Sequence, residues 1–305
     1  MRVLIAGAGA TGGAFGTRLQ EAGREVTYLV RPHRAAALRD HGLTFDAPDG
    51  KRTNPLRVMT ASEVSEPFDV VIVAVKSHGF PAVIDDIAPA VGHDTLIIPF
   101  LNGMAHIDQL QARYGDRVLG GLVKIVATVR GDEIVQMTPL ATMTLGPLGD
   151  RPGNFDAVLD VMRVQGIELV ESHDVVGALW AKWAFIAAAG VVSCLFRGSV
   201  GDVIEAGGLG YITRAIDEME AVAAAAGHPV NEGAHKQSVE LLTEPGSSFT
   251  SSLYRDAAAG NPTETEHILG DYALRAAAFG IDTPLLDLTL VQLRAGEIAR
   301  ARDSR

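Results

Sequence analysis

The chain has 305 residues, 47% of them hydrophobic and 21% charged, so it can bury the core of one large domain or of two ordinary ones. Its formal net charge of −11 disfavours binding to nucleic acid or to anionic membrane surfaces. The one basic cluster is Arg31, His33, Arg34 and Arg39, about the size of a single phosphate site. Because Cys194 is the only cysteine, an intrachain disulfide and a cysteine-based metal site are both excluded.

The N-terminus and the apolar segments favour a soluble, cytoplasmic protein. Gly7 interrupts the N-terminal apolar run too early for a signal-peptide core. The longest strongly apolar run, Trp183–Phe196, is shorter than the roughly 20 residues needed to span a bilayer. We therefore expect a small-molecule partner, no metal, and neither a nucleic acid nor a membrane. The sequence is compatible with a homodimer.

The first part of the chain alternates strand-like and helix-like segments. A strand is expected at Arg2–Ala6, a helix at Ala10–Ala22 and a second strand at Glu25–Val30. Two later runs, Phe68–Val75 and Thr95–Phe100, are almost wholly apolar, as in strands that are buried on both faces of a parallel sheet. This alternation predicts an α/β domain of the Rossmann type.

The pattern then changes to longer β-rich segments. Residues 118–148 contain a turn at Arg130–Asp132 and predict an antiparallel extension of the sheet. A helix at Phe155–Val164 and a strand at Ile167–Glu171 are expected to close this domain.

Beyond Ser172 strand signals fade, and alanine, leucine and glutamate dominate, which predicts an all-α C-terminal domain. The expected domains are therefore residues 1–171 and residues 172–305. Residues after Glu297 have the composition of a frayed, charged tail.

A glycine-rich turn follows the first predicted strand and opens the first predicted helix. It reads Gly7, Ala8, Gly9, Ala10, Thr11, Gly12 and matches the G-x-G-x-x-G pattern. In this setting the glycines allow a tight turn, close approach of a pyrophosphate and close packing of helix on strand, while the helix N-terminus offers N–H groups to the phosphates. The turn predicts a dinucleotide site; a glycine-rich turn with no ligand is the alternative.

The end of the second strand bears on the choice between NAD and NADP. An NAD-binding chain commonly places a carboxylate there for the ribose 2′-hydroxyl, whereas this chain has Arg31, followed by His33 and Arg34. A guanidinium suits a 2′-phosphate, so NADP(H) is the predicted cofactor. The alternative is that Arg31 is only a solvated loop cation.

One lysine stands out in an apolar stretch. Val175–Phe196 contains a single charged residue, Lys182, and apart from Ser193 it has no polar face, so most of its circumference should be buried. A buried ammonium needs a partner or a lowered pKa, which is the profile of a general acid near neutral pH. Alternatively, Lys182 lies near the helix start and extends its head into solvent.

With these features in place, the chain resembles the ketopantoate reductase family, NADP-dependent enzymes of pantothenate biosynthesis that reduce 2-dehydropantoate to (R)-pantoate. The resemblance covers nearly the whole length. It rests on the glycine turn and Arg31, and further on these segments: Val73–Lys76, Asn102–Met104, Leu179–Lys182, Ser251–Leu253 with Asp256, and Thr263–Glu264.

The resemblance implies roles for individual residues. Lys182 looks like the family's lysine, which hydrogen-bonds the keto oxygen and donates the proton, and Glu264 looks like the acidic residue beside it. Asn102 and Ser252 look like substrate-binding groups, with Asn102 also near the nicotinamide, and Lys76 looks like a cofactor-side residue. Without the resemblance, Glu264 would be an ordinary helix-start carboxylate, Asn102 a turn residue and Ser252 a helix cap.

Three departures from the family's sequence bear on the choice of substrate. Where the family has asparagines, this chain has Ile186, Gly190 and Leu269. Lost hydrogen-bonding groups change affinity for a hydroxyl-bearing substrate. The predicted function is therefore NADPH-dependent reduction of a 2-keto acid, with 2-dehydropantoate as first candidate and a keto acid with an apolar side chain as alternative. A non-catalytic NADP(H)-binding redox sensor and a β-hydroxyacid or opine-type dehydrogenase are the competing functions.

Overall fold

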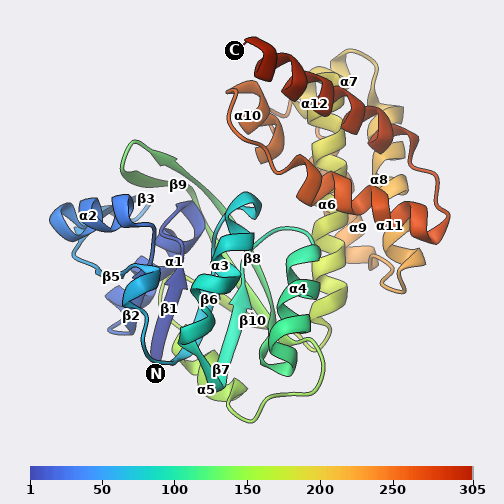
Figure 1. The fold of residues 1–305 in the computed structure, drawn as a ribbon. Helices are drawn as coiled ribbons and strands as arrows, with labels where there is room; N and C mark the ends of the chain where they lie inside the picture. Colours follow the sequence, from blue (N-terminus) through green and yellow to red (C-terminus); the bar gives the residue numbers. More distant parts are fainter. Residues whose placement is uncertain (304–305) are drawn as a thin grey trace. The chain divides into compact units, whose positions relative to one another are not determined.

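In the computed structural model, which describes residues 1–303, the chain divides into two compact units. The sheet unit contains Met1–Leu101 and His106–Val175. The helical unit contains the turn Asn102–Ala105 and the chain from Val176 onward. Figure 1 shows strands only in the first unit and helices throughout the second. The predicted fold class, a Rossmann-type α/β domain followed by an all-α domain, is confirmed.

A five-stranded parallel sheet forms the centre of the sheet unit, with the strand order β5-β2-β1-β6-β7. The strands are β1 (Arg2–Ala6), β2 (Glu25–Leu29), β5 (Arg57–Met59), β6 (Phe68–Val73) and β7 (Val91–Pro99). The four helices that accompany them are α1 (Ala10–Glu21), α2 (Pro32–His41), α3 (Phe80–Asp86) and α4 (Ala105–Tyr114). The order reverses between β1 and β6, and ligands bind at the carboxyl ends of strands at such a point.

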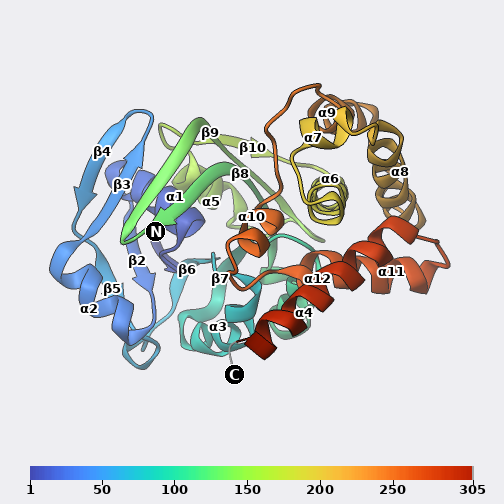
Figure 2. The same cartoon turned by 90° about the horizontal axis from the view of Figure 1, so that it is seen from above.

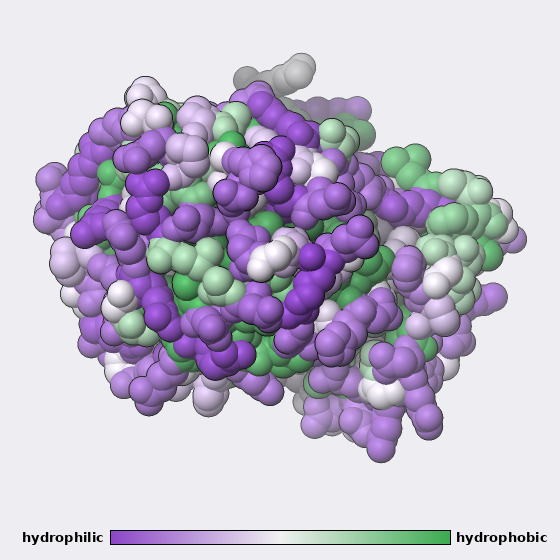
Figure 3. Space-filling view, turned by 90° about the horizontal axis from the view of Figure 1, so that it is seen from below, coloured by the Kyte–Doolittle hydropathy of each residue, from purple (hydrophilic) through white to green (hydrophobic). Residues whose placement is uncertain are grey.

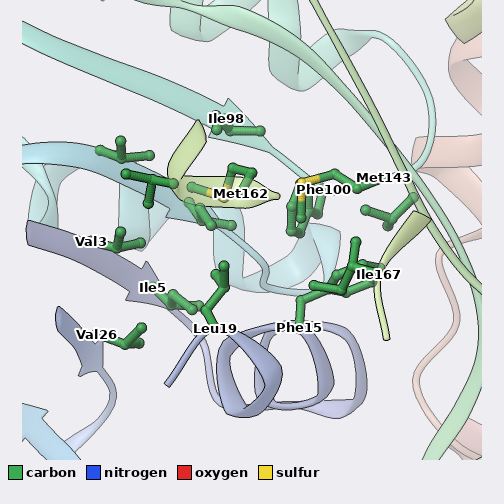
Figure 4. Packing of buried hydrophobic residues seen from close by; sticks show 14 of the residues in the cluster. Val3, Ile5, Phe15, Leu19, Val26, Ile98, Phe100, Met143, Met162 and Ile167 are labelled. Atoms are coloured by element: carbon green, nitrogen blue, oxygen red, sulfur yellow. The ribbon is translucent and has the colours of Figure 1, made fainter. Parts of the chain in front are cut away.

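Alternation along β1 assigns its side chains to two separate cores. Val3 and Ile5 are fully buried in one cluster, together with Phe15 of α1, whereas Leu4 and Ala6 are buried in the other, with residues of α3 and α4. This is the two-residue period of a strand that is covered on both faces. Figure 4 shows Phe15 and Leu19 pointing from α1 toward the strand side chains, and the Phe15 ring lies 5.5 Å from that of Phe100.

A second sheet of five strands packs on the same helix α1. Its members are β3 (Leu43–Ala47), β4 (Gly50–Asn54), β8 (Leu119–Arg130), β9 (Glu133–Pro147) and β10 (Glu168–Glu171), and α5 (Phe155–Met162) precedes β10. The predicted antiparallel hairpin is β8–β9, but it joins β3 and β10 in this second sheet and meets the first through a single bridge between Ile97 and Val118. A Cβ on Gly13 would clash with the end of the Ile134 side chain, so a larger residue there would force that side chain of β9 to shift.

The helical unit is built around α6 (Val175–Phe196). The surrounding elements are α7 (Val200–Glu205), α8 (Leu209–Ala225), α9 (Glu232–Leu242), α10 (Ser252–Ala258), a π-helical turn (Glu266–Gly270), α11 (Asp271–Phe279) and α12 (Pro284–Asp303). Figure 2 looks along α6 and shows these helices around it. The α12 N-terminus is capped by the buried carboxylate of Glu218, which accepts hydrogen bonds from the backbone N–H groups of Leu285 and Leu286.

Two sequence-based expectations need correction. The residues after Glu297 are not a frayed tail, since α12 continues to Asp303; residues 304 and 305 lie outside the described part. The sequence also predicts that no apolar run is long enough to span a bilayer, whereas one helix among the described residues, α6, is long and apolar enough to do so; 61% of its most apolar window is buried inside the protein. Such burial is what a core helix requires. Hydrophilic side chains dominate the face of the molecule in Figure 3.

A buried arginine links α1 to the second sheet. The Arg18 side chain is 8% exposed, and its guanidinium donates to Gln136 of β9 and to Asp49, both at 3.0 Å. The guanidinium also lies over the ring of Phe45, 5.3 Å from its centroid. Hydrogen bonds from a buried charge are among the stronger ones, so this contact contributes to the attachment of the sheet to the helix.

Replacing Arg18 by Met keeps the length of the side chain and removes its donors. We expect the free energy of unfolding to fall by about 2 kcal/mol, as measured by urea denaturation. The matched control is Arg39→Met, which breaks an Arg39–Glu63 pair whose side chains are both 44% exposed and should cost less than about 1 kcal/mol. Equal losses in the two variants would contradict this role of Arg18.

Candidate active site

The glycine turn between β1 and α1 has the geometry that its sequence predicts. Gly7 has φ +109°, and a Cβ there would lie 2.6 Å from the carbonyl oxygen of Ala74, which follows β6. A Cβ on Gly12 would clash with the carbonyl oxygen of Gly7. Both positions therefore require glycine for the backbone alone, because the ends of β1 and β6 approach each other closely here.

Gly9 is different, because no atom lies within 4 Å of a Cβ built on it. It is the N-cap of α1, where no side chain caps the helix and no acidic residue lies in the first turn. The space beside Gly9 is therefore open at the positive end of the helix, and no side chain caps the N–H groups of the first turn. A glycine with open space beside an uncapped helix N-terminus fits a pyrophosphate, which needs close backbone approach.

Arg31 follows β2 and is the N-cap of α2. Its neighbours in the basic cluster are paired, Arg34 with Asp132 and Arg39 with Glu63. Within residues 1–303 Arg31 has no ion pair or side-chain hydrogen bond, and it is exposed. A Cβ on Gly79 would lie 3.9 Å from Arg31 Nη2, so the guanidinium points toward the segment that follows β6.

Lys76 begins that segment as the exposed N-cap of the 3₁₀ turn Ser77–Gly79. The glycine turn and the Ala74 carbonyl lie side by side, so Lys76 belongs to the carboxyl edge of the sheet. Arg31, Lys76 and the N-terminus of α1 make this edge attractive to phosphate groups. The residues present fit a dinucleotide.

In the helical unit, Lys182 is the eighth of the 22 residues of α6, about two turns from its start. No residue from Val175 to Leu195 is exposed, and in the central part of the helix Ala181 and Phe185 are half-buried, as are Ala178, Lys182 and Ile186. Their spacing of four residues places them in one strip along the helix. The only charge of α6 therefore lies on the side where the packing is least complete, with Ile186 one turn away.

Ser252 begins α10 and is exposed. The capping role considered for it belongs instead to Ser251, whose hydroxyl accepts a hydrogen bond from the Tyr254 N–H at 3.1 Å. The Ser251 N–H in turn donates to Ser193 Oγ of α6 at 3.1 Å. Ser252 is thus attached to α6 through its neighbour while its own hydroxyl is not used as a cap.

Cys194 lies beside this network and is buried. Burial raises the pKa of its thiol to about 12. A thiol with so high a pKa is not an effective nucleophile near neutral pH, so the cysteine has a packing role.

Glu264 is half-buried and precedes the π-helical turn. Its carbonyl oxygen accepts a hydrogen bond from the Ile268 N–H at 2.9 Å. The turn Asn102–Gly103 lies against the same segment, since a Cβ on Gly103 would be 3.1 Å from the carbonyl oxygen of His267. The segments that carry Asn102 and Glu264 are therefore neighbours.

The space beside Gly190 is occupied by two leucines. A Cβ on Gly190 would lie 3.4 Å from Leu269 and 3.6 Å from Leu253. Leu269 is fully buried and Leu253 is 4% exposed. Of the three departures noted in the sequence, Gly190 and Leu269 therefore pack against each other, and Ile186 is the one in the half-buried strip with Lys182.

Sequence reasoning missed the residues that hold these segments together. Trp183 Nε1 donates to the carbonyl oxygen of Ile268 at 2.9 Å, and Ser193 accepts from Ser251. Ser193 carried a usable signal as the one uncharged polar side chain of α6. The π-helical turn had none, because its sequence is compatible with an ordinary helix.

Comparison with known protein families matches almost the whole chain. Residues 3–150 match the family described as Ketopantoate reductase PanE/ApbA, and residues 174–297 match Ketopantoate reductase PanE/ApbA C terminal. An uncharacterized oxidoreductase, YkpB, of Bacillus subtilis (strain 168) is 31% identical over 301 residues, covering 97% of this chain and 99% of the relative. A 2-dehydropantoate 2-reductase of Archaeoglobus fulgidus is 28% identical over 297 residues, 97% of each chain.

Solved structures share the fold at lower identity. D-mandelate dehydrogenase with NADH and anilino(oxo)acetate has a TM-score of 0.88 at 20% identity, covering 98% of this chain and 99% of that chain. A PanE/ApbA family ketopantoate reductase from Ralstonia eutropha JMP134 also has a TM-score of 0.88, at 23% identity, covering 99% of this chain and 100% of that chain. A dimeric ketopantoate reductase from Staphylococcus aureus has a TM-score of 0.82 at 24% identity, covering 98% and 99%. Both family matches and the 31% identity to YkpB establish that this chain belongs to the ketopantoate reductase family.

Proposed function

We propose that the protein is an NADPH-dependent 2-keto acid reductase in which Lys182 is the proton donor. The observation that carries the proposal is the position of Lys182, the only charge of α6, in a half-buried strip of an otherwise closely packed helix. An ammonium held there is a proton donor fixed on a mostly buried helix. Carbonyl reduction needs such a donor at the oxygen on which negative charge develops.

The roles of the other residues follow from this chemistry. The reduced nicotinamide, when bound, supplies a hydride to the keto carbon. Lys182 hydrogen-bonds the keto oxygen and gives it a proton, and Glu264 supplies the negative charge that keeps the lysine protonated. Asn102 and Ser252 orient the substrate by hydrogen bonding.

Support for NADP(H) comes from Arg31. It is exposed, it has no carboxylate partner within residues 1–303, and it stands where a chain selective for NAD would place an acid. A guanidinium binds a phosphate through two parallel hydrogen bonds. Gly9 and the α1 N-terminus support the pyrophosphate, and Lys76 adds positive charge to the same edge.

Two substrates are candidates. 2-Dehydropantoate, reduced to (R)-pantoate, is the substrate named for the Archaeoglobus relative and is our first candidate. A 2-keto acid with an apolar side chain is the second, because Ile186 adds an apolar surface one turn from Lys182. An isoleucine offers no hydrogen bond to a substrate hydroxyl, and this absence weakens selection for one.

A panel of 2-keto acids with NADPH oxidation as readout tests the proposed reaction. We expect turnover of 2-dehydropantoate or of an apolar 2-keto acid, and a loss of at least about 100-fold in kcat for Lys182→Ala, because the proton donor is removed. The control is Lys236→Ala, at a lysine of the helical unit that is 75% exposed. Near-normal turnover by the Lys182 variant would exclude it as the acid, and a lack of turnover of every acid would favour the redox-sensor function.

Replacing Arg31 by Ala tests the cofactor preference. The variant should lose about tenfold or more in kcat/KM for NADPH and little for NADH, because only NADPH presents a 2′-phosphate to the guanidinium. Arg39→Ala, in the same cluster but paired with Glu63, should leave the ratio unchanged. An unaltered ratio in the Arg31 variant would assign cofactor selection to other residues.

The two glycines of the turn should respond differently to alanine. Gly9→Ala fills the open space above the α1 N-terminus and should weaken NADPH binding about tenfold while the melting temperature of the free protein is retained. Gly12→Ala forces a clash with the Gly7 carbonyl and should lower the melting temperature itself. Fluorescence titration and thermal unfolding separate the two effects, and normal NADPH affinity in Gly9→Ala would contradict the pyrophosphate site.

A further inference from the structure

Trp183 directly follows Lys182 in α6, and its indole hydrogen-bonds the chain segment that contains Glu264. Trp183 is 1% exposed, and its Nε1–H donates to the carbonyl oxygen of Ile268 at 2.9 Å. The Ile268 N–H donates to the carbonyl oxygen of Glu264, also at 2.9 Å. The backbone of Ile268 is therefore hydrogen-bonded to Trp183 through its carbonyl oxygen and to Glu264 through its N–H.

The backbone at this point is specialised. Glu266–Gly270 is π-helical, and its wider turn displaces carbonyl groups from the regular α-helical ladder. π-Helical turns are rare and occur often at functional sites. Here the turn presents the Ile268 carbonyl to a donor on another helix.

The donor has little freedom to move. The ring of Trp183 meets that of Tyr272 edge-on at 4.5 Å and that of Trp180 at 5.1 Å, and the guanidinium of Arg275 lies 5.5 Å from its centroid. The Tyr272 hydroxyl donates to the Met219 carbonyl at 2.6 Å, which fixes the ring that supports the indole. A donor held on several sides retains its geometry.

We propose that Trp183 is a positioning residue, whose hydrogen bond to Ile268 holds the Glu264 segment in register with Lys182. The proposal rests on the proposed function, which assigns Lys182 and Glu264 to the reaction. A carboxylate kept near an ammonium favours its charged form, so the bond helps Lys182 to stay protonated. Other ionisable groups around this cluster are His267 on the π turn, Arg275 with Asp271, Tyr272, and His228 stacked on Trp180.

The decisive variant is Trp183→Phe, which retains an aromatic ring and removes the donor. We expect kcat to fall about tenfold, the KM for NADPH to stay within about twofold, and the alkaline limb of kcat to move to lower pH. Trp180→Phe is the matched control, because Trp180 belongs to the same ring cluster but has no hydrogen bond from its indole among the described residues. An unmoved pH limb in Trp183→Phe, with lower stability only, would reduce Trp183 to a packing residue.

A measurement that needs no turnover separates this proposal from the proposed function. The lysines can be dimethylated with ¹³C, and the resonance absent from Lys182→Ala identifies Lys182. The pKa of Lys182 should fall by about half a unit or more in Trp183→Phe and stay in place in Trp180→Phe. An equal pKa in wild type and Trp183→Phe would overturn the proposal, even if a keto acid is reduced. If no keto acid is reduced, the proposed function fails. The pKa comparison alone then decides whether the Trp183–Ile268 hydrogen bond affects Lys182. If Trp183→Phe does not fold, slow hydrogen exchange of the Trp183 indole N–H in wild-type protein is required, and fast exchange overturns the proposal.

Discussion

An apolar helix surface must be covered by other apolar surface. Because α6 is apolar on nearly all sides, the other helices of the helical unit have to pack around it. Its residues from Leu179 to Cys194 are buried or half-buried, so the elements that follow have to pack around it. Small residues at Gly190 and the neighbouring alanines let Leu253 and Leu269 come close. The segments that carry Ser252 and Glu264 reach α6 as a consequence of this packing. An unpaired charge on such a helix would be costly to bury, so the presence of Lys182 there supports its proposed role as the proton donor.

The sheet unit follows from a different requirement, the close approach of backbone to backbone. At Gly7 and Gly12 the ends of β1 and β6 leave no room for a side chain, whereas at Gly9 the room is open. The glycines of this pattern therefore have two roles: Gly7 and Gly12 are needed for the backbone fold, and Gly9 leaves open space in which a ligand could bind. Arg31, which follows the neighbouring strand β2, has no carboxylate partner among the described residues, in contrast to Arg34 and Arg39.

Much of the fold was predictable because its signals are local and periodic. The apolar runs of β6 and β7 and the glycine turn after β1 predict the parallel sheet, and the loss of strand signals beyond residue 172 predicts the all-α part. The partners of the β8–β9 hairpin were not predictable, because strand pairing depends on contacts between segments far apart in sequence. The β3–β4 hairpin was missed for a related reason: its strands are short, and β4 is largely solvent-facing.

The chemical groups of the candidate site were predictable from the sequence, but the hydrogen bonds and packing that hold them in place were not. Lys182 stood out as the one charge in an apolar helix, and the family resemblance supplied Glu264, Asn102 and Ser252. The indole bond of Trp183 and the π turn left no trace in the sequence, because each depends on how two distant segments meet. From the sequence, Ile186, Gly190 and Leu269 are three equivalent departures from the family. In the structure, Ile186 lies in the half-buried strip with Lys182, whereas Gly190 and Leu269 pack against each other.

The most direct test of the account is a crystal structure of the protein with NADP⁺ and a 2-keto acid bound together. If Lys182 is the proton donor, its Nζ lies within about 2.7–3.2 Å of the keto oxygen, and Ile186 contacts the side chain of the acid. A keto oxygen bound by other groups, with Lys182 directed away from it, would contradict the assignment of Lys182 as the proton donor.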